Sequence, residues 1–179
     1  MSDIFNEYLV KRKNGPKQLL YKALIALAAI AIMAASLYFV GVFSLIIICA
    51  VGVGVFFAYK EFEVEYEYIL TNNELDIDRI TSRERRRNVL NADVKKFEIL
   101  APVKSEHASR LRDRNIRRTL DYSSGRSDDL KWFAIYDNGK GEKTLLYFDP
   151  PRKMRDGIRT FVPRAVMEPK NAPDTPRAE

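Results

Sequence analysis

The chain contains 179 residues, with 30 Lys and Arg against 24 Asp and Glu, which gives a net charge of +6. Its only cysteine, Cys49, excludes an intrachain disulfide, and its only histidine, His107, excludes a metal site or proton relay built on two histidines. The basic balance fits either a nucleic acid or an anionic lipid surface as partner, and charge alone does not choose between them.

Residues 1–18 form a polar lead in front of a long apolar segment. The apolar residues of the lead fall at helical spacing, which predicts a short amphipathic helix at a membrane interface: Ile4, Phe5, Tyr8 and Leu9. The basic triplet Lys11-Arg12-Lys13 and the breaker Asn14-Gly15-Pro16 follow. A signal peptide also begins with basic residues, but this apolar segment is too long and ends without a small-residue cleavage site. We therefore interpret it as an uncleaved anchor.

The apolar segment from Ala23 to Tyr59 holds no charged residue in thirty-seven positions. One straight helix of that length would run about 55 Å, whereas the hydrocarbon core of a membrane is ~30 Å thick. The sequence therefore predicts a hairpin of two transmembrane spans, about 19–38 and 42–59, joined by a turn without charges. Two spans put both termini on one side, and the basic flanks make that side the cytoplasm. The lipid bilayer of the inner (cytoplasmic) membrane is thus the first predicted partner.

Small residues recur every four positions on both predicted spans: Ala31 and Ala35 on the first, and Ala50, Gly54 and Ala58 on the second. Such faces let helix backbones approach closely in lipid. Either the two spans pack on each other through these faces, or one face pairs with a second protomer.

Residues 60–164 predict one cytoplasmic domain of short antiparallel strands, about six or seven in number. Apolar and polar residues alternate from Phe62 to Thr71, as in a half-buried strand. Asn72-Asn73 fits a tight turn, because Asn tolerates positive φ. Further strands are predicted at 75–80, 83–90, 94–100, 131–137 and 144–148. The last of these is apolar on both faces, so we expect it to be covered on both sides.

The polar segment 104–129 interrupts this pattern and ends in Asp121-Tyr122-Ser123-Ser124-Gly125. Asp and Ser side chains bond their own backbone and Gly supplies positive φ, so these five residues predict a turn. A loop that contacts a ligand or partner is the alternative interpretation.

An amphipathic helix is predicted over 150–162, followed by a disordered tail at 165–179. One helix face is apolar and consists of Met154, Ile158, Phe161 and Val162. The opposite face carries Arg152, Arg155 and Arg159.

Successive antiparallel strands, a long variable loop and one closing helix resemble the plan of a pleckstrin-homology (PH)-like domain. The chain resembles bacterial membrane proteins that carry such a domain after one or two transmembrane hairpins, above all a small family of two-span proteins in anaerobic Gram-positive bacteria. The similar segments lie between residue 1 and about 168: Asp3-Ile4-Phe5, Lys11-Arg12-Lys13, Glu65-Tyr66-Glu67-Tyr68, 71–78, 121–125 and the terminal helix. The resemblance implies an α+β membrane protein with a PH-like barrel or sandwich, and it implies no activity. Eukaryotic PH domains bind phosphoinositides through a basic first hairpin, whereas Phe62–Asp78 is acidic here, so that role is not implied.

Three arginines share one face of a predicted strand: Arg83, Arg85 and Arg87. One interpretation is a basic strip that faces the anionic cytoplasmic leaflet. The other is a solvated face that pairs with carboxylates of a neighbouring strand: Glu63, Glu65 and Glu67.

A second arginine cluster lies in the segment 104–129: Arg110, Arg112, Arg114, Arg117 and Arg118. Lipid headgroups, a nucleic acid or an acidic partner would suit it. Binding of a nucleic acid favours interleaved aromatic residues for stacking, and only Tyr122 lies near, so a nucleic acid is the less favoured partner.

No catalytic, cofactor or metal site is predicted. A Ser-His-Asp set can be assembled only on paper from Ser123 or Ser124, His107 and Asp121, because no nucleophile-elbow sequence surrounds either serine. The favoured function is a non-enzymatic, membrane-anchored interaction or scaffold module, whose partner is another protein or a second copy of the chain. The alternative is binding or sensing of anionic phospholipid through the arginines.

Overall fold

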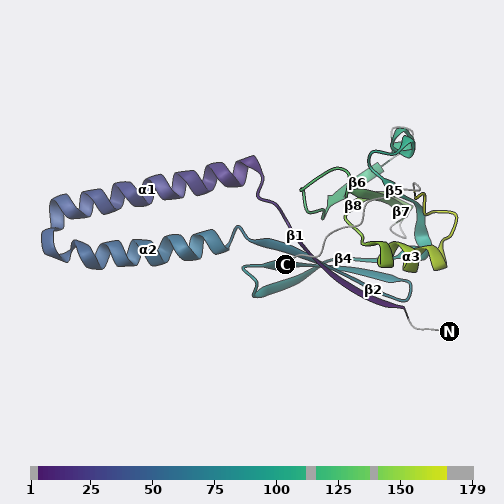
Figure 1. The fold of residues 1–179 in the computed structure, drawn as a ribbon, viewed down its shortest axis with the longest axis horizontal. Coiled ribbons are helices and arrows are strands. Elements are labelled where there is room, and N and C mark those ends of the chain that lie inside the picture. The colour runs from purple at the N-terminus through teal and green to yellow at the C-terminus, as the bar shows by residue number, and fades with distance from the viewer. Residues whose placement is uncertain (1–3, 112–115, 138–140, 169–179) are drawn as a thin grey trace.

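The structure, a computed structural model, describes residues 4–111, 116–137 and 141–168. A helical arm projects from one end of a β-sheet body (Figure 1). The elements follow the chain in this order: β1 (Phe5–Lys11), α1 (Pro16–Val40), the 3-10 turn η1 (Gly41–Phe43), α2 (Ser44–Lys60), β2 (Val64–Thr71), β3 (Glu74–Thr81), β4 (Arg85–Asp93), η2 (Val94–Lys96), β5 (Phe97–Pro102), η3 (Glu106–Leu111), β6 (Ile116–Asp121), β7 (Trp132–Asp137), β8 (Lys143–Phe148) and α3 (Arg152–Phe161).

The helical arm consists of α1, η1 and α2. The chain reverses at η1, where Gly41 has a φ of +60°, and α1 and α2 lie side by side (Figure 1). At the base of the arm the Tyr59 hydroxyl donates to the Lys22 carbonyl oxygen at 2.9 Å. By length and composition, the helical segment Pro16–Lys60 is able to cross a membrane.

The two helices pack through residues other than the predicted small-residue faces. Ala29, Ser36 and Ser44 are buried, whereas four of the five predicted packing residues are exposed: Ala31, Ala35, Ala50 and Gly54. Only Ala58 is half-buried, and a Cβ placed on Gly54 would meet nothing within 4 Å. The prediction that α1 and α2 pack through these faces was therefore wrong, because each helix turns a different side towards its neighbour. Pairing with a second protomer stays a prediction.

The lead is a strand, not the predicted interfacial helix. β1 pairs antiparallel with β2, with Tyr8 opposite Tyr68 and Val10 opposite Tyr66. Tyr8 and Val10 are buried, so the period of the lead is two. Pairing with β2 forms hydrogen bonds to the backbone groups of β1 that face it and places these two side chains in the core, where a helix at the membrane interface would not put them.

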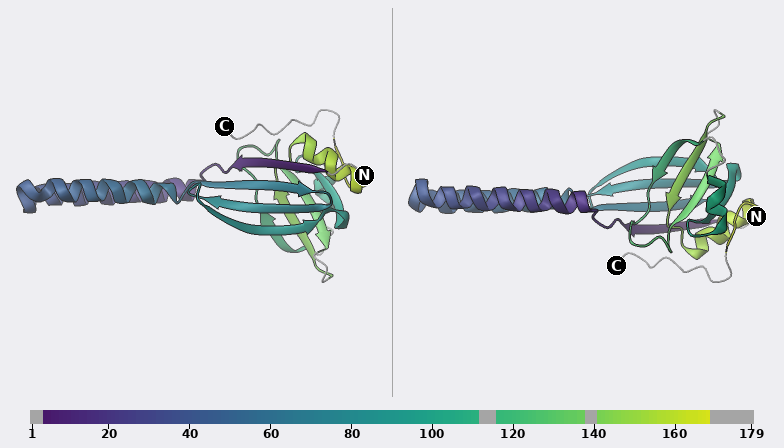
Figure 2. Two further views of the ribbon diagram at one scale, coloured as in Figure 1. Left: turned by 90° about the horizontal axis from the view of Figure 1, so that it is seen from below. Right: turned by 90° about the horizontal axis from the view of Figure 1, so that it is seen from above.

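Two four-stranded sheets form the body. Sheet A has the order β1-β2-β3-β4 and sheet B the order β5-β7-β8-β6. All neighbours are antiparallel except β6 and β8, which are parallel. The strands of sheet A run along nearly the same direction as the helical arm (Figure 2). The polar segment 104–129, which interrupts the predicted strands, contains a strand of its own, β6, at the edge of sheet B.

One core joins both sheets and α3. It includes Tyr68, Leu70, Leu75, Trp132, Leu146, Phe148, Met154 and Ile158. A second cluster covers the other face of sheet B: Ile99, Ala101, Phe133, Ile135 and Leu145. Because both faces of sheet B are covered, β8 is buried on both sides, as its apolar sequence predicted.

The first residues of the predicted disordered tail are packed. Ala165 and Val166 are buried, and Leu100 exchanges backbone hydrogen bonds with this segment: Leu100 N donates to Ala165 O and Met167 N donates to Leu100 O, both at 2.8 Å. The tail prediction was therefore wrong for 165–168, because the segment pairs with β5. Residues 169–179 lie outside the described part of the chain.

Candidate functional site

The strand arginines flank the base of the helical arm. Arg83 lies in the turn before β4 with a φ of +60°, and it pairs with Glu63 at 3.4 Å. Arg85 pairs with Glu61 at 3.5 Å. Arg87 is exposed farther along β4. Both ion pairs are exposed and contribute at most about 1 kcal/mol each. The predicted face therefore does not form one strip of free cations, since two of its three arginines have carboxylate neighbours.

Arg86 belongs to the same run of arginines but was not predicted on the face shared by Arg83, Arg85 and Arg87; it lies beside Glu67, the most buried carboxylate of sheet A. It pairs with Glu67 and lies 3.8 Å from Asp78. Burial raises the pKa of Glu67, a hydrogen bond with Glu7 raises it further, and the charge of Arg86 opposes both. The strand alternation placed Glu67 on a solvated face, whereas only 4% of it is exposed.

The second arginine cluster is only partly described. Arg112 and Arg114 lie outside the described residues, as does the side chain of Arg110 in η3. Arg117 and Arg118 are consecutive on β6 and both exposed. Arg117 pairs with Glu142 at 2.6 Å. Since successive strand residues point to opposite faces, Arg117 and Arg118 do not form one cationic patch.

A basic hollow lies where β1 leads into α1. It encloses about 710 Å³ between the link from Arg12 to Gln18 and Gly125 of the 121–125 turn. Three cationic side chains line it, namely Arg12, Lys13 and Lys17. The sequence marked the basic triplet only as a flank of the anchor, because the approach of Gly125 depends on tertiary structure.

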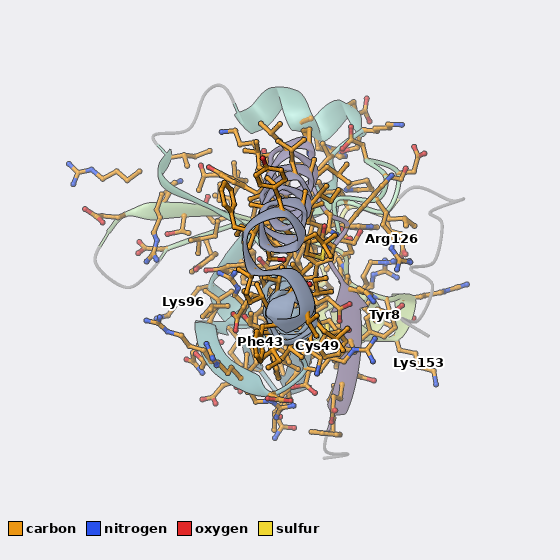
Figure 3. The ribbon with its side chains drawn as sticks, turned by 90° about the vertical axis from the view of Figure 1, so that its left-hand side faces the viewer. Tyr8, Phe43, Cys49, Lys96, Arg126 and Lys153 are labelled. Carbon is orange, nitrogen blue, oxygen red and sulfur yellow. The ribbon has the colours of Figure 1, made fainter. Side chains whose placement is uncertain are left out.

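Backbone hydrogen bonds fix the walls of this hollow. Arg12 N donates to Val64 O at 2.9 Å, and Lys13 N donates to Ser124 O at 2.7 Å. The Arg12 guanidinium donates to the Tyr66 hydroxyl at 2.7 Å and lies 5.8 Å from the centre of its ring. Figure 3, which looks along the arm from its tip, shows Phe43 and Cys49 on the helices and Arg126, next to Gly125, to one side of them.

The segment Asp121–Gly125 forms the predicted turn. The Asp121 carboxylate accepts from Ser123 N at 3.0 Å and from the Ser123 hydroxyl at 2.6 Å, and Gly125 has a φ of +65°. Burial would raise the pKa of Asp121, but hydrogen bonds from Lys131 and Ser123 outweigh it and lower that pKa. The turn thereby becomes a fixed wall of the basic hollow.

A buried polar network holds this turn against both sheets. Ser124 N donates to Asp149 Oδ2 at 2.7 Å, and Asp149 N donates to the Tyr68 hydroxyl at 3.3 Å. That hydroxyl donates to Tyr122 O at 2.6 Å. Burial raises the pKa of Asp149, against the hydrogen bonds from Ser124 and the charge of Lys131. Burial also raises the pKa of Tyr68 well above its ordinary value, so its hydroxyl stays protonated as a donor.

Arg155 is buried within the body, which corrects its predicted place on the polar face of the terminal helix. Its side chain is 0% exposed and lies 4.7 Å from the centre of the Trp132 ring. Nε donates to Glu168 at 3.0 Å, and Nη1 donates to Pro150 O at 2.9 Å. These partners come from segments outside the helix, so the helical pattern alone could not reveal them. Arg152 and Arg159 are exposed and half-exposed, as the pattern predicted.

No catalytic set is assembled in the described part of the chain. His107 lines a shallow hollow with Ser105, Glu106 and 166–168. No contact of the described residues joins it to Ser123 or Asp121, whose partners are each other and Lys131. The described residues also contain no group of three or more side chains suited to hold a metal ion.

Two packed sheets with one C-terminal helix define a PH-like body, and comparison of the sequence agrees with this assignment. Residues 2–168 match the family described as bacterial PH-like domain (DUF6106), so the chain belongs to that family, which confirms the predicted domain type. The comparisons with curated proteins and with solved structures gave no match.

Proposed function

We propose that the protein is a non-enzymatic interaction module of the bacterial inner membrane, anchored by two membrane spans. The observation that carries this proposal is the helical arm. Its large apolar side chains are exposed along both helices, among them Leu20, Leu27, Ile30, Leu45, Ile46, Val53 and Phe57. An apolar surface of this extent requires a partner other than water, and a lipid bilayer is the partner that fits a pair of long helices.

The lengths of the two helices support two crossings. α1 has 25 residues and α2 has 17, which correspond to about 37 and 26 Å against a core of ~30 Å. Tyr38, Phe39 and Phe43 are exposed near the tip, and Tyr21 and Tyr59 lie near the base. Aromatic residues favour both membrane interfaces, so the aromatic residues at the tip and the base mark the two interfaces. Because the basic residues flanking the hairpin favour the cytoplasmic side, both termini and the body lie in the cytoplasm in this proposal.

The junction between the arm and the body supports a fixed mount rather than a flexible tether. Only residues 61–63 separate α2 from β2. Phe62 N donates to Tyr59 O at 3.2 Å, and Ser82 N donates to Glu63 O at 3.1 Å. On the other side β1 leads into α1 and is hydrogen-bonded to β2 across the junction. A body held in this way keeps one orientation to the membrane, as a module that presents a surface to a partner requires.

Membrane extraction tests the anchor. The full chain should stay in the membrane pellet after a wash with alkaline carbonate, whereas a protein bound only by charge is released. The matched variant replaces Ile30 and Val53 by arginine, one central charge in each helix, and should reduce the membrane-integrated fraction. Release of the wild-type chain by carbonate would refute the anchor.

Crosslinking in native membranes tests the interaction role. A photoreactive side chain at exposed positions of the body should trap a species of defined mass, either with another protein or with a second copy of the chain. The same group placed at the buried position Leu146 is the control. A chain that yields only the monomer from every exposed position would contradict a scaffold role.

A further inference from the structure

Arg12, Lys13 and Lys17, which line the basic hollow, have no carboxylate neighbour in the described part of the chain. Eight other cations of the body do have one: Arg83, Arg85, Arg86, Arg117, Arg155, Lys104, Lys131 and Lys143. The walls of the hollow also contain no acidic residue. The hollow therefore presents a positive charge that the described chain does not neutralise.

The hollow is held open rather than collapsed. Arg12 is fixed by the Tyr66 hydroxyl and ring, and the opposite wall is fixed by Asp121 and Asp149 through the 121–125 turn. Its volume of about 710 Å³ lies within the ~300–1,000 Å³ of ordinary ligand pockets. A preformed site of this kind needs little rearrangement to accept an anion.

The position of the hollow selects the kind of anion. Its wall includes Pro16, the first residue of α1, and the exposed apolar residues Leu19 and Leu20 follow within one helical turn. With α1 in the bilayer, the hollow lies at the level of the lipid headgroups. A lipid bound there would place its phosphate among the cations and its acyl chains along α1.

We propose that the basic hollow binds the headgroup of an anionic phospholipid from the cytoplasmic leaflet. The site rests on the proposed anchor, and it moves the expected lipid contact from the strand arginines to Arg12, Lys13 and Lys17. Binding there would attach a lipid both to the first turn of α1 and to the 121–125 turn. The lipid would thus stabilise the orientation of the body against the membrane.

The test uses the full chain in detergent and native mass spectrometry with dioctanoyl phosphatidylglycerol. Dioctanoyl phosphatidylcholine and free glycerol phosphate serve as neutral-lipid and free-phosphate controls. Wild-type protein should retain phosphatidylglycerol in preference to both. The double variant Lys13→Gln/Lys17→Gln should lose affinity about 10- to 30-fold, because each cation near a lipid surface contributes roughly a factor of five. Adding Arg12→Gln should weaken binding further.

A matched variant separates a local site from overall charge. Arg83→Gln/Arg85→Gln/Arg87→Gln removes three positive charges, as many as the triple hollow variant, and should keep phosphatidylglycerol binding within about threefold of wild type. Equal losses in the two triple variants, or equal retention of the two lipids by wild type, would overturn the site. Trp132 fluorescence verifies that each variant is folded. Carbonate extraction distinguishes the two proposals: a wild-type chain that stays in the membrane but shows no lipid preference keeps the anchor and loses only the site.

Discussion

Substitution of Glu168 by glutamine should lower the free energy of unfolding of the body by several kcal/mol. The effect is expected although Glu168 lies in a segment that the sequence predicted to be disordered. The change removes the carboxylate that pairs with Arg155 and Arg159 while its size stays the same. Arg155 is then left fully buried without a counter-charge: its described neighbours are the Pro150 carbonyl oxygen, the Trp132 ring and, in place of the carboxylate, a neutral amide. The C-terminal segment also loses one of the contacts that hold it against the body, while its backbone hydrogen bonds with Leu100 remain.

The expected loss of stability follows from how deeply the Arg155 and Glu168 side chains are buried. The Arg155 side chain is 0% exposed and that of Glu168 is 17% exposed. Removal of one partner of a buried ion pair costs about 3–5 kcal/mol, and the partly exposed carboxylate places this case near 3 kcal/mol. Arg159, 39% exposed, adds at most about 1 kcal/mol. With a urea m-value of about 1.5 kcal/mol per M, the unfolding midpoint should fall by roughly 2 M.

Trp132, the only tryptophan of the chain, is buried and reports the unfolding of the body through its fluorescence. The full chain in detergent is titrated with urea, and circular dichroism provides a second probe. The control is Glu142→Gln, which removes the exposed pair with Arg117 and should change the free energy of unfolding by less than about 0.5 kcal/mol. If the two variants behave alike, the buried ion pair does not secure the C-terminal segment.

Three further substitutions test the interior, each by urea unfolding of the full chain. Tyr68→Phe removes a buried hydroxyl that serves both Tyr122 and Asp149, so it should cost about 1–3 kcal/mol; an unchanged midpoint would deny the network a structural role. Gly157→Val should cost about 2 kcal/mol, because even a Cβ would lie 3.0 Å from the Leu70 side chain of β2, and a stabilised variant would show that this side chain can move aside. Burial raises the pKa of Asp149, so the folded protein binds its proton more tightly than the unfolded chain, and this group costs stability as pH rises from about 4. The stability of Asp149→Asn relative to wild type should therefore increase between about pH 4 and 7, whereas a constant difference would show that the carboxyl has its ordinary pKa.

Local patterns predicted those elements whose partners are close in sequence. The alternation from Val64 to Leu70 and the turn at Asn72-Asn73 correspond to the hairpin of β2 and β3. The amphipathic pattern near the C-terminus corresponds to α3, with Met154 and Ile158 in the core. In these cases each residue's environment follows from its immediate neighbours along the chain, so periodicity was sufficient.

The missed features depend on contacts between distant segments. β1 pairs with β2, and the whole helical arm lies between these two strands in the sequence. Nothing near β1 in the sequence indicated this partner, and the apolar residues of the lead also fit a helical spacing, which concealed the alternation of Tyr8 and Val10. The helical pattern placed Arg155 on the polar face of α3, whereas contacts with Trp132 and Glu168 allow its side chain to be buried. The basic hollow needs Gly125 beside the Arg12–Gln18 link, which no local signal in either segment indicates.

Cysteine labelling in intact cells tests the central claim, that two spans hold the body in the cytoplasm, most directly. With Cys49, the only cysteine, replaced by alanine, single cysteines are placed at Val42 in the tip of the arm and at the exposed Lys153 of α3. A membrane-impermeant maleimide should label the Val42→Cys variant from outside and the Lys153→Cys variant only after permeabilisation. Labelling of the Lys153 position in intact cells, or protection of the Val42 position from the external reagent, would contradict the account.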